Sequence, residues 1–512
     1  MKDGVGLNPP SLVSGAVPAP RGLGVSGLTR MISVALMSVL AFALNLWGIA
    51  TPEPWRDEAA TWMSTQRSLG DLLSMLRSVD AVHGVYYLGV RLWILPFGDS
   101  VFSLRALSAL GVAVGVALVM QLGHHLFGWV AALGAGISYA VLPPLTWAAT
   151  EARSYAWAGV LSCMVALAFW VAHDRGGWRP WLVYSVTVIV AVHGFVYNAL
   201  VVVAAVGLSL AWLRSGQRIR AAVATAGALV ACVPFALLVA SQGSQVSWLN
   251  TYPVTVSDVT MAVFWGTEDV SQIVGTSVLV VALGFVAQAW WSGRSRGQLA
   301  YVVGWLVLPL AMLLALHPVL PLYHRRYLLV SIPALALVLG FLVARLRWVW
   351  LRVLLVMVLV AGCVPGYLHS REPLSKLTPG PAIRELAKRA KAGDGIYVVG
   401  SDENGLAWAF PVPIASMVDL STPLDDRWRA SQLYSASVPV QDLGSRLESL
   451  ERVWLWSDIG ALEETEAAFA LQGFDFDRRF QAKDHYRTVL VLLQRSNRGR
   501  FSASARIGSL SA

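Results

Sequence analysis

The sequence predicts a polytopic α-helical membrane protein with about eleven transmembrane helices, followed by a small extracytoplasmic α/β domain. Of its 512 residues, 56% are hydrophobic and only 13% are charged. The mean hydropathy is +0.59. A soluble domain carries about 25% charged residues, so a soluble fold is excluded for most of the chain. The hydropathy drops after about Ser370, where strand and helix patterns typical of a soluble domain begin.

Eleven apolar runs are long enough, or nearly so, to cross a bilayer, which takes roughly 20 helical residues. They are Met31–Ala50, Val101–Leu122, Val130–Trp147, Tyr155–Ala172, Trp181–Phe195, Tyr197–Leu213, Ala221–Ala240, Ile273–Trp291, Ala300–Leu316, Leu328–Ala344 and Trp348–Tyr367. Two shorter runs, Leu69–Leu76 and Val85–Phe97, are predicted to be amphipathic helices that lie in the membrane interface, in the first outer loop. No small-residue cleavage site follows the first run, so we expect a retained helix rather than a signal peptide.

The arginines predict how these helices are oriented. With a cytoplasmic N-terminus, the inner turns hold Arg175, Arg179, Arg214, Arg218, Arg220, Arg294, Arg296, Arg345, Arg347 and Arg352. The outer turns after the first loop hold only Arg153, Arg325 and Arg326. This asymmetry follows the positive-inside rule, provided that residues 83–97 do not cross the membrane. It predicts a multi-pass protein of the cell membrane whose C-terminal domain lies outside the cytoplasm.

The predicted domain organisation has four parts. Residues 1–29 form a disordered cytoplasmic tail, 30–369 the transmembrane domain, 370–496 the α/β domain and 497–512 a second disordered tail. In the α/β domain we expect helices at Pro381–Ala392 and Ala461–Leu471, and strands at Ile396–Val399, Arg452–Trp456 and Tyr486–Leu493. The net charge of +9 does not indicate nucleic acid, because most arginines lie in turns between apolar runs or in the C-terminal part. The three cysteines lie in apolar runs and are predicted to pack there.

The tetrapeptide Trp55-Arg56-Asp57-Glu58 follows the first apolar run directly. Two adjacent carboxylates beside an arginine at a bilayer edge are costly to desolvate, which favours a catalytic role. The alternative is that Asp57 caps a short interfacial helix beginning near Glu58, with Arg56 as its neutralising partner.

Four further polar clusters are predicted on the same outer face. They are Asp80 and His83 with Tyr86 and Tyr87; Glu151-Ala152-Arg153-Ser154-Tyr155; His193 with Tyr197 and Asn198; and Tyr323-His324-Arg325-Arg326-Tyr327. Each has a structural alternative. His83 could be an interfacial hydrogen-bonding residue, Glu151 and Arg153 an internal salt bridge, and His193 a packed histidine. Arg325 and Arg326 could bind lipid headgroups unspecifically. The coincidence of the clusters on one face favours a common site.

This set of side chains suits the transfer of a sugar from a lipid phosphate. Phosphate is a good leaving group, so the reaction needs cations to hold it, a role open to Arg325, Arg326 and His83. It also needs a carboxylate that takes the proton from the acceptor hydroxyl, for which Asp57 is the candidate. Whether a divalent metal joins Asp57 is left open. The α/β domain contains no Gly-x-Gly-x-x-Gly, so no dinucleotide site is expected there.

Several of these stretches resemble the GT-C glycosyltransferases. The matching segments are Trp55-Arg56-Asp57-Glu58-Ala59, His83-Gly84-Val85-Tyr86-Tyr87, Phe97-Gly98-Asp99-Ser100 with Ser103-Leu104-Arg105, Glu151-Ala152-Arg153-Ser154-Tyr155 and, with the topology, Arg325-Arg326-Tyr327. The likeness covers residues 31 to about 370 and is nearest to the protein O-mannosyltransferase and aminoarabinose transferase group (glycosyltransferase family 39-like). Many members of that group have His-Pro-Pro or Lys-Pro-Pro where this chain has His83-Gly84-Val85.

The resemblance implies an inverting glycosyltransferase with a polyprenyl-phosphate sugar donor, mannose being favoured, and a glycan, lipid or protein acceptor. The expected catalytic residues are Asp57 and Glu58. The expected substrate-binding residues are Arg56, His83, Tyr87, Glu151, Arg153, Tyr155, His193, Tyr323, His324, Arg325 and Arg326. The rival interpretations are a transporter or flippase and a non-catalytic scaffold. A transporter is disfavoured because the ionisable residues gather at one interface and no internal repeat is visible.

Overall fold

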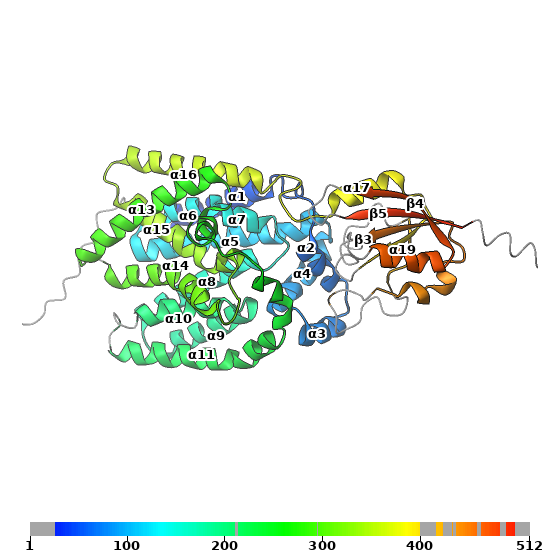
Figure 1. The fold of residues 1–512 in the computed structure, drawn as a ribbon. Coiled ribbons are helices and arrows are strands. Elements are labelled where there is room, and N and C mark those ends of the chain that lie inside the picture. The colour runs from blue at the N-terminus through cyan, green and yellow to red at the C-terminus, as the bar shows by residue number, and fades with distance from the viewer. Residues whose placement is uncertain are drawn as a thin grey trace, which may run out of the picture.

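The structure of the protein, a computed structural model, describes residues 26–209, 213, 215–293, 295–399, 416–422, 433, 437–457, 462–481 and 488–496. Its long helices lie side by side in one domain, and a small sheet domain lies beyond one end of them (Figure 1). Both predicted tails fall mostly outside the described residues, although the first helix, α1 (Gly27–Leu46), already begins within 1–29. The side chain of Ser26 caps α1 by accepting a hydrogen bond from the backbone N–H of Thr29.

A helix stands at each of the eleven predicted runs. The others are α5 (Val101–Phe127), α6 (Trp129–Val141) with α7 (Pro143–Ala149), α8 (Tyr155–Arg175), α9 (Trp178–Gly194), α10 (Asn198–Ser209), α11 (Ser215–Ser241), α13 (Asp269–Trp291), α14 (Arg296–Leu316), α15 (Ile332–Arg345) and α16 (Val349–His369). Within the described ranges, eight helical segments are long and apolar enough to span a membrane. The number of such segments is nine if the pair α6–α7, which is bent by 55° at Pro143, is counted as one span. The chain is therefore a multi-pass membrane protein.

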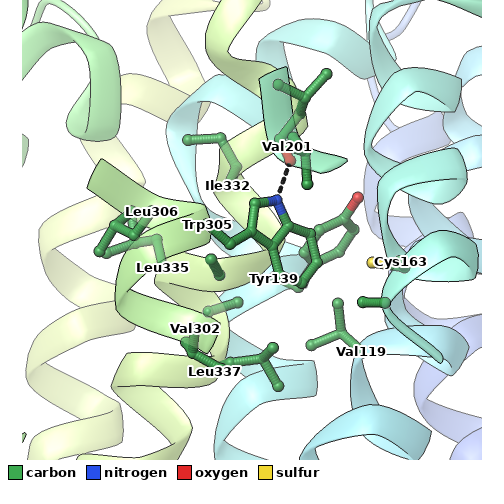
Figure 2. Packing of buried hydrophobic residues seen from close by; sticks show 14 of the residues in the cluster. Val119, Tyr139, Cys163, Val201, Val302, Trp305, Leu306, Ile332, Leu335 and Leu337 are labelled. Atoms are coloured by element: carbon green, nitrogen blue, oxygen red, sulfur yellow. Dashed lines mark hydrogen bonds between the residues drawn. The ribbon is translucent and has the colours of Figure 1, made fainter. Parts of the chain in front are cut away.

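Small residues let neighbouring helices approach closely inside this domain. A Cβ added at Gly340 of α15 would lie 2.3 Å from the carbonyl oxygen of Ala131 in α6, so only glycine fits there. Figure 2 shows the apolar packing nearby, where Trp305 of α14 lies among Val302, Ile332 and other aliphatic side chains. The Trp305 indole N–H donates to the carbonyl oxygen of Val330 at 2.7 Å, so its polar atom is satisfied within the core.

Three short helices cover the end of the bundle that faces the sheet domain (Figure 1). They are α2 (Arg56–Thr65), α3 (Leu69–Ser78) and α4 (Gly84–Phe97), and the last two match the predicted interfacial helices. At 14 residues, α4 is too short to span, which is the condition for the predicted orientation. Between α11 and α13 the chain forms the short helices η3 (Gly243–Asn250), η4 (Asp258–Ala262) and α12 (Val263–Trp265). The segment η5 (Arg325–Ser331) precedes α15.

The C-terminal domain is a mixed five-stranded sheet with the strand order β2-β1-β3-β5-β4. Its strands are β1 (Gly395–Val398), β2 (Val418–Asp419), β3 (Arg452–Ser457), β4 (Phe474–Gln481) and β5 (Val489–Arg495). Both β2 and β3 pair with β1 in parallel, whereas β3 and β4 pair with β5 antiparallel. Alternate residues of β3 point to opposite faces, where α17 (Gly380–Arg389) covers Trp454 and α19 (Leu462–Leu471) covers Leu455. The short helices η6 (Val440–Asp442) and η7 (Gly444–Arg446) complete this domain, and α/β is the class predicted from the sequence.

Candidate active site

The Asp57 carboxylate lies between two guanidinium groups that come from distant parts of the chain. Arg326 Nη1 donates to Asp57 Oδ2 at 2.9 Å, and Arg153 Nη2 lies 3.8 Å from Oδ1. The Asp57 side chain is 18% exposed. It does not cap α2, because the helix begins at Arg56 with Trp55 as N-cap and Asp57 stands in its first turn. The capping alternative is therefore wrong, and α2 presents Asp57 to the arginines instead.

Arg153 is held by a second carboxylate. Its Nη1 donates to Asp80 Oδ2 at 3.2 Å and to the hydroxyl of Tyr87, which itself donates to Asp80. Asp80 is buried and has φ of 60°, in the left-handed region that aspartate tolerates better than most residues. Burial opposes its ionisation, but the charge of Arg153 and the hydrogen bonds from Tyr87 and Arg153 outweigh this effect and lower the pKa of Asp80 below its ordinary value. Asp80 therefore serves as a permanent counter-ion for Arg153.

Aromatic rings surround Arg326. The guanidinium carbon lies 5.8 Å from the ring centre of Trp55, 5.6 Å from Tyr155, 5.2 Å from Trp248 and 5.5 Å from Tyr327. Cation–π attraction to four rings fixes the position of the charge while excluding most water from it. The Arg326 side chain is only 13% exposed.

Both arginines keep unused donors. The Nε–H groups of Arg153 and Arg326 are buried and have no hydrogen-bond partner among the described residues. Buried N–H groups are normally paired, so an unpaired one marks a place where a further acceptor is favourable. Two such donors beside one carboxylate are typical of a site that receives an anion.

Glu58 has a different environment although it is the next residue of α2. Arg105 donates two hydrogen bonds of 2.7 Å to its carboxylate, and Lys376 Nζ lies 3.3 Å from its Oε2. The backbone N–H of Ala152 donates to its Oε1 at 3.1 Å. Burial opposes its ionisation, but Arg105 and Lys376 more than offset burial and lower the pKa of Glu58 to about 2. Glu58 is therefore an ionised, fully paired group.

Glu151 completes this buried cluster. Lys376 Nζ lies 2.9 Å from its Oε1, and the indole N–H of Trp55 donates to its Oε2 at 2.8 Å. Burial raises the pKa of Glu151 to about 7, with Lys376 opposing and the nearby Glu58 carboxylate adding to the rise. We call Glu58, Arg105, Glu151 and Lys376 the buried quartet.

His83 lies beside the arginines without being charged. Its Nδ1 is 2.8 Å from the hydroxyl oxygen of Ser154. Burial and the neighbouring Arg153 guanidinium lower the pKa of His83 to about 3. The imidazole is therefore neutral near pH 7, so His83 can offer a hydrogen bond to a phosphate but not the charge expected from the sequence.

Arg325 points away from the Asp57 cluster, toward the segment before α12. Its Nη1 is 4.0 Å from Asp258 Oδ1, and its side chain is 40% exposed. The Tyr323 hydroxyl donates to the backbone carbonyl of Asp258 at 3.2 Å. His324 Nδ1 accepts the backbone N–H of Arg326 at 3.3 Å, and burial with Arg326 lowers the pKa of His324 to about 2. Tyr323 and His324 thus shape the turn that presents Arg326.

One predicted residue, His193, lies apart from these contacts. His193 Nδ1 is 2.8 Å from the carbonyl oxygen of Ile189, and its ring stacks on Phe235 at 4.5 Å. This is the packed-histidine alternative. Arg56 is exposed at the start of α2.

The donor set around Asp57 fits an anion better than a metal ion. Both carboxylate oxygens face guanidinium groups, whereas a divalent cation prefers several carboxylate or histidine ligands. In the part of the chain that the structure describes, no group of three or more His, Cys, Asp or Glu residues is placed to hold a metal.

No family model and no curated protein matches the sequence. The structure, in contrast, is similar to ArnT from Cupriavidus metallidurans bound to undecaprenyl phosphate, with a TM-score of 0.55 and 13% identity over 90% of this chain and 98% of ArnT. ArnT in the apo state gives a TM-score of 0.56 at 13% identity, covering 91% and 98%. AglB from Archaeoglobus fulgidus, in complex with an inhibitory peptide and a dolichol-phosphate, gives 0.51 at 11% identity, covering 87% and 70%.

The chain has the GT-C fold. ArnT, an aminoarabinose transferase, and AglB, an oligosaccharyltransferase, both belong to the GT-C superfamily, so the fold resemblance expected from the sequence is confirmed. The match spans nearly all of ArnT, which makes the likeness one of the whole chain.

Within this GT-C fold, several residues near the site were not identified as site residues from the sequence. They are Lys376 and Arg105 of the buried quartet, Trp248 over Arg326, and Gln242 and Gln245, whose side-chain carbonyls accept the backbone N–H groups of Ala81 and Asp80. The sequence indicated Arg105 only as part of the Ser103-Leu104-Arg105 segment that resembles the GT-C glycosyltransferases. The others carried no local signal, because their partners are far away in the sequence.

Proposed function

We propose that the protein is an integral-membrane glycosyltransferase that moves a sugar from a polyprenyl-phosphate donor to an extracytoplasmic acceptor with inversion. The observation that carries this proposal is the Asp57 carboxylate held between Arg153 and Arg326, each of which retains an unpartnered N–H within the described structure. Transfer of a sugar from a lipid phosphate needs one carboxylate to accept a proton and cations, largely shielded from water, to stabilise the departing phosphate.

The donor phosphate binds to Arg326 and Arg153. A guanidinium forms charge-assisted, often paired hydrogen bonds to phosphate oxygens, and a site with little water strengthens them. The phosphate competes with Asp57 for Arg326 and so frees one carboxylate oxygen. Tyr87, Tyr155 and neutral His83 line the same region and orient the donor by hydrogen bonds and ring contacts.

The freed Asp57 carboxylate is the general base. As the acceptor hydroxyl oxygen forms a bond to the anomeric carbon, the bond from that carbon to the phosphate oxygen breaks. The hydroxyl proton passes to Asp57, and the polyprenyl phosphate leaves with the bonding electron pair, stabilised by Arg326 and Arg153. Attack opposite to the leaving group inverts the anomeric centre.

The remaining residues act around this centre. Glu58 and Glu151 fix α2 and the Glu151–Tyr155 loop, Tyr323 and His324 hold the turn that carries Arg326, and Arg325 and Arg56 meet more distal parts of the substrates or lipid headgroups. His193 is a packing residue in this proposal. Mannose is the favoured sugar, and the extracytoplasmic placement of the site follows from the arginine distribution.

The structural neighbours support the donor class. ArnT was crystallised with undecaprenyl phosphate and AglB with a dolichol-phosphate, so two proteins of this fold hold a polyprenyl phosphate. At 13% and 11% identity these neighbours support the lipid phosphate in general and leave the sugar to experiment.

The test uses purified protein in lipid nanodiscs with polyprenyl phosphates that carry radiolabelled mannose or other sugars. We expect at least one donor to release free polyprenyl phosphate, with its label transferred to an acceptor. In proteoliposomes, movement of the intact lipid-linked sugar across the bilayer without bond cleavage would favour the transporter interpretation and contradict the proposal.

A further inference from the structure

The segment between α16 and α17 is part of the scaffold of the site. We call residues 371–378 the strap. Arg371 Nη1 donates to the carbonyl oxygen of Thr146 at 3.0 Å, Pro373 accepts the backbone N–H of Glu53 at 2.9 Å, and Thr378 donates to the Pro54 carbonyl at 2.8 Å. The strap thus runs from the end of α7 to the start of α2 before it enters the C-terminal domain.

Lys376, in the middle of the strap, is one of the most buried cations among the described residues. Its side chain is 2% exposed, and its Nζ reaches Glu58 at 3.3 Å, Glu151 at 2.9 Å and the backbone carbonyl of Thr150. Lys376 and Arg105 together balance the two carboxylates of the buried quartet. Removing Lys376 would leave two buried carboxylates close to a single cation, a costly arrangement.

Both carboxylates that Lys376 holds are directly connected to the phosphate-binding groups. Glu58 is adjacent to Asp57 on α2, so fixing Glu58 fixes the rotation of that helix turn. Glu151 is two residues from Arg153, and it accepts the Trp55 indole N–H while the Trp55 ring lies 5.8 Å from the Arg326 guanidinium.

We propose that Lys376 is a positioning residue for the lipid-phosphate site: by pairing with both Glu58 and Glu151, the strap of the C-terminal domain sets the geometry of Asp57, Arg153 and Arg326. This inference rests on the proposed function of that site. Lys376 has no contact with the proposed substrate and acts through its two partners.

The pairing makes the site sensitive to pH through Glu151. The groups facing Glu151 are the Lys376 ammonium, the Glu58 carboxylate, the Arg105 guanidinium and the Trp55 indole N–H. Burial raises the pKa of Glu151 to about 7 while Lys376 opposes the rise, so protonation in that range weakens the pair with Lys376 and the hydrogen bond from Trp55. Affinity for a lipid phosphate should therefore fall as the pH drops through about 7. Without Lys376 the pKa of Glu151 rises further, and the fall begins at higher pH.

The test measures the affinity of the full-length protein in nanodiscs for undecaprenyl phosphate between about pH 5.5 and 9. Lys376→Met should weaken binding roughly ten- to hundredfold at neutral pH, the scale expected for a misplaced site, and should move the pH midpoint upward. Lys376→Arg should restore part of the affinity. Lys388→Met is the matched control, because Lys388 is 70% exposed on α17, and it should behave as the wild type.

A second variant keeps the inference testable if Lys376→Met does not fold. Glu151→Gln keeps the shape but cannot ionise, so it should hold the protein at its low-affinity level and leave only the pH dependence of the phosphate's own second ionisation, at about pH 6. A wild type that binds undecaprenyl phosphate with no pH step beyond the phosphate's own, or a folded Lys376→Met with wild-type affinity and pH profile, would overturn the inference alone. A wild type that does not bind the lipid phosphate would contradict the proposed function and the inference with it.

Discussion

Asp57 and Glu58 are adjacent in the sequence and on the same helical turn, yet they lie in opposite environments. Glu58 is 3% exposed and every oxygen of its carboxylate is paired, within a quartet of two acids and two bases. Asp57 is 18% exposed and faces two arginines that still have unused donors among the described contacts. Successive helical residues point about 100° apart. One turn of α2 can therefore place Glu58 in the buried quartet and Asp57 beside Arg153 and Arg326.

The contrast separates two uses of buried charge. The quartet joins α2, α5, the loop after α7 and the strap by charges that cancel when Glu151 is ionised, and a paired cluster of this kind specifies one arrangement of its segments. The Asp57 cluster is left incompletely paired, which costs stability and favours an incoming anion. In the proposed mechanism the first cluster supplies rigidity, and the second supplies the reacting groups.

Asp57→Asn should show the largest effect on the reaction. Asparagine keeps the size of the side chain but cannot take a proton from the acceptor hydroxyl, and general-base assistance contributes about 10²- to 10⁴-fold. Turnover of a polyprenyl-phosphate sugar should fall by that factor while donor binding persists. Near-normal turnover in a folded variant would remove Asp57 from the mechanism.

Glu58→Gln should instead show its largest effect on stability. Removing one partner of a buried pair leaves the Arg105 and Lys376 charges undercompensated, at a cost of about 3–5 kcal/mol. Thermal unfolding in detergent should detect this loss, and Asp57→Asn, at a more exposed site, should unfold closer to the wild type. Equal destabilisation by both variants would abolish the distinction between the two clusters.

Arg326→Gln and Arg325→Gln form the third comparison. Arg326 is enclosed by four rings and bonded to Asp57, so its loss should weaken undecaprenyl phosphate binding by roughly 10- to 100-fold, as expected for a charged hydrogen bond of about 1.5–3 kcal/mol. Arg325 is 40% exposed and lies 4.0 Å from Asp258, so its loss should change affinity only about twofold. Isothermal binding curves for the two variants measure the difference. Equal losses of affinity in the two variants would indicate that both arginines only contact lipid headgroups unspecifically.

Much of the fold followed from the sequence, because long apolar runs and short amphipathic ones are local signals. The prediction missed β4, an edge strand whose sequence Phe474-Asp475-Phe476-Asp477 continues with two arginines, since most of its side chains are exposed and it lacks the apolar character of a buried strand. It also missed β2, which has only two residues.

The site was predictable where a motif carried the polar residues together, as at Asp57, Arg153 and Arg326. It was not predictable for Lys376, which lies 318 positions from Glu58 in a segment without a recognisable pattern. His193 is a residue type often found in active sites, but its ring packs between helices and its Nδ1 contacts the Ile189 carbonyl oxygen. The residue type alone does not show which face of a helix a side chain occupies.

The position of the phosphate in a structure with bound undecaprenyl phosphate tests the central claim most directly. The account predicts phosphate oxygens within hydrogen-bond distance of the guanidinium groups of both Arg326 and Arg153, with the Asp57 carboxylate beside the phosphorus-bound oxygens and no longer paired with Arg326. A phosphate held by Arg325 or at another face, with the Arg153–Asp57–Arg326 contacts unchanged, would contradict it.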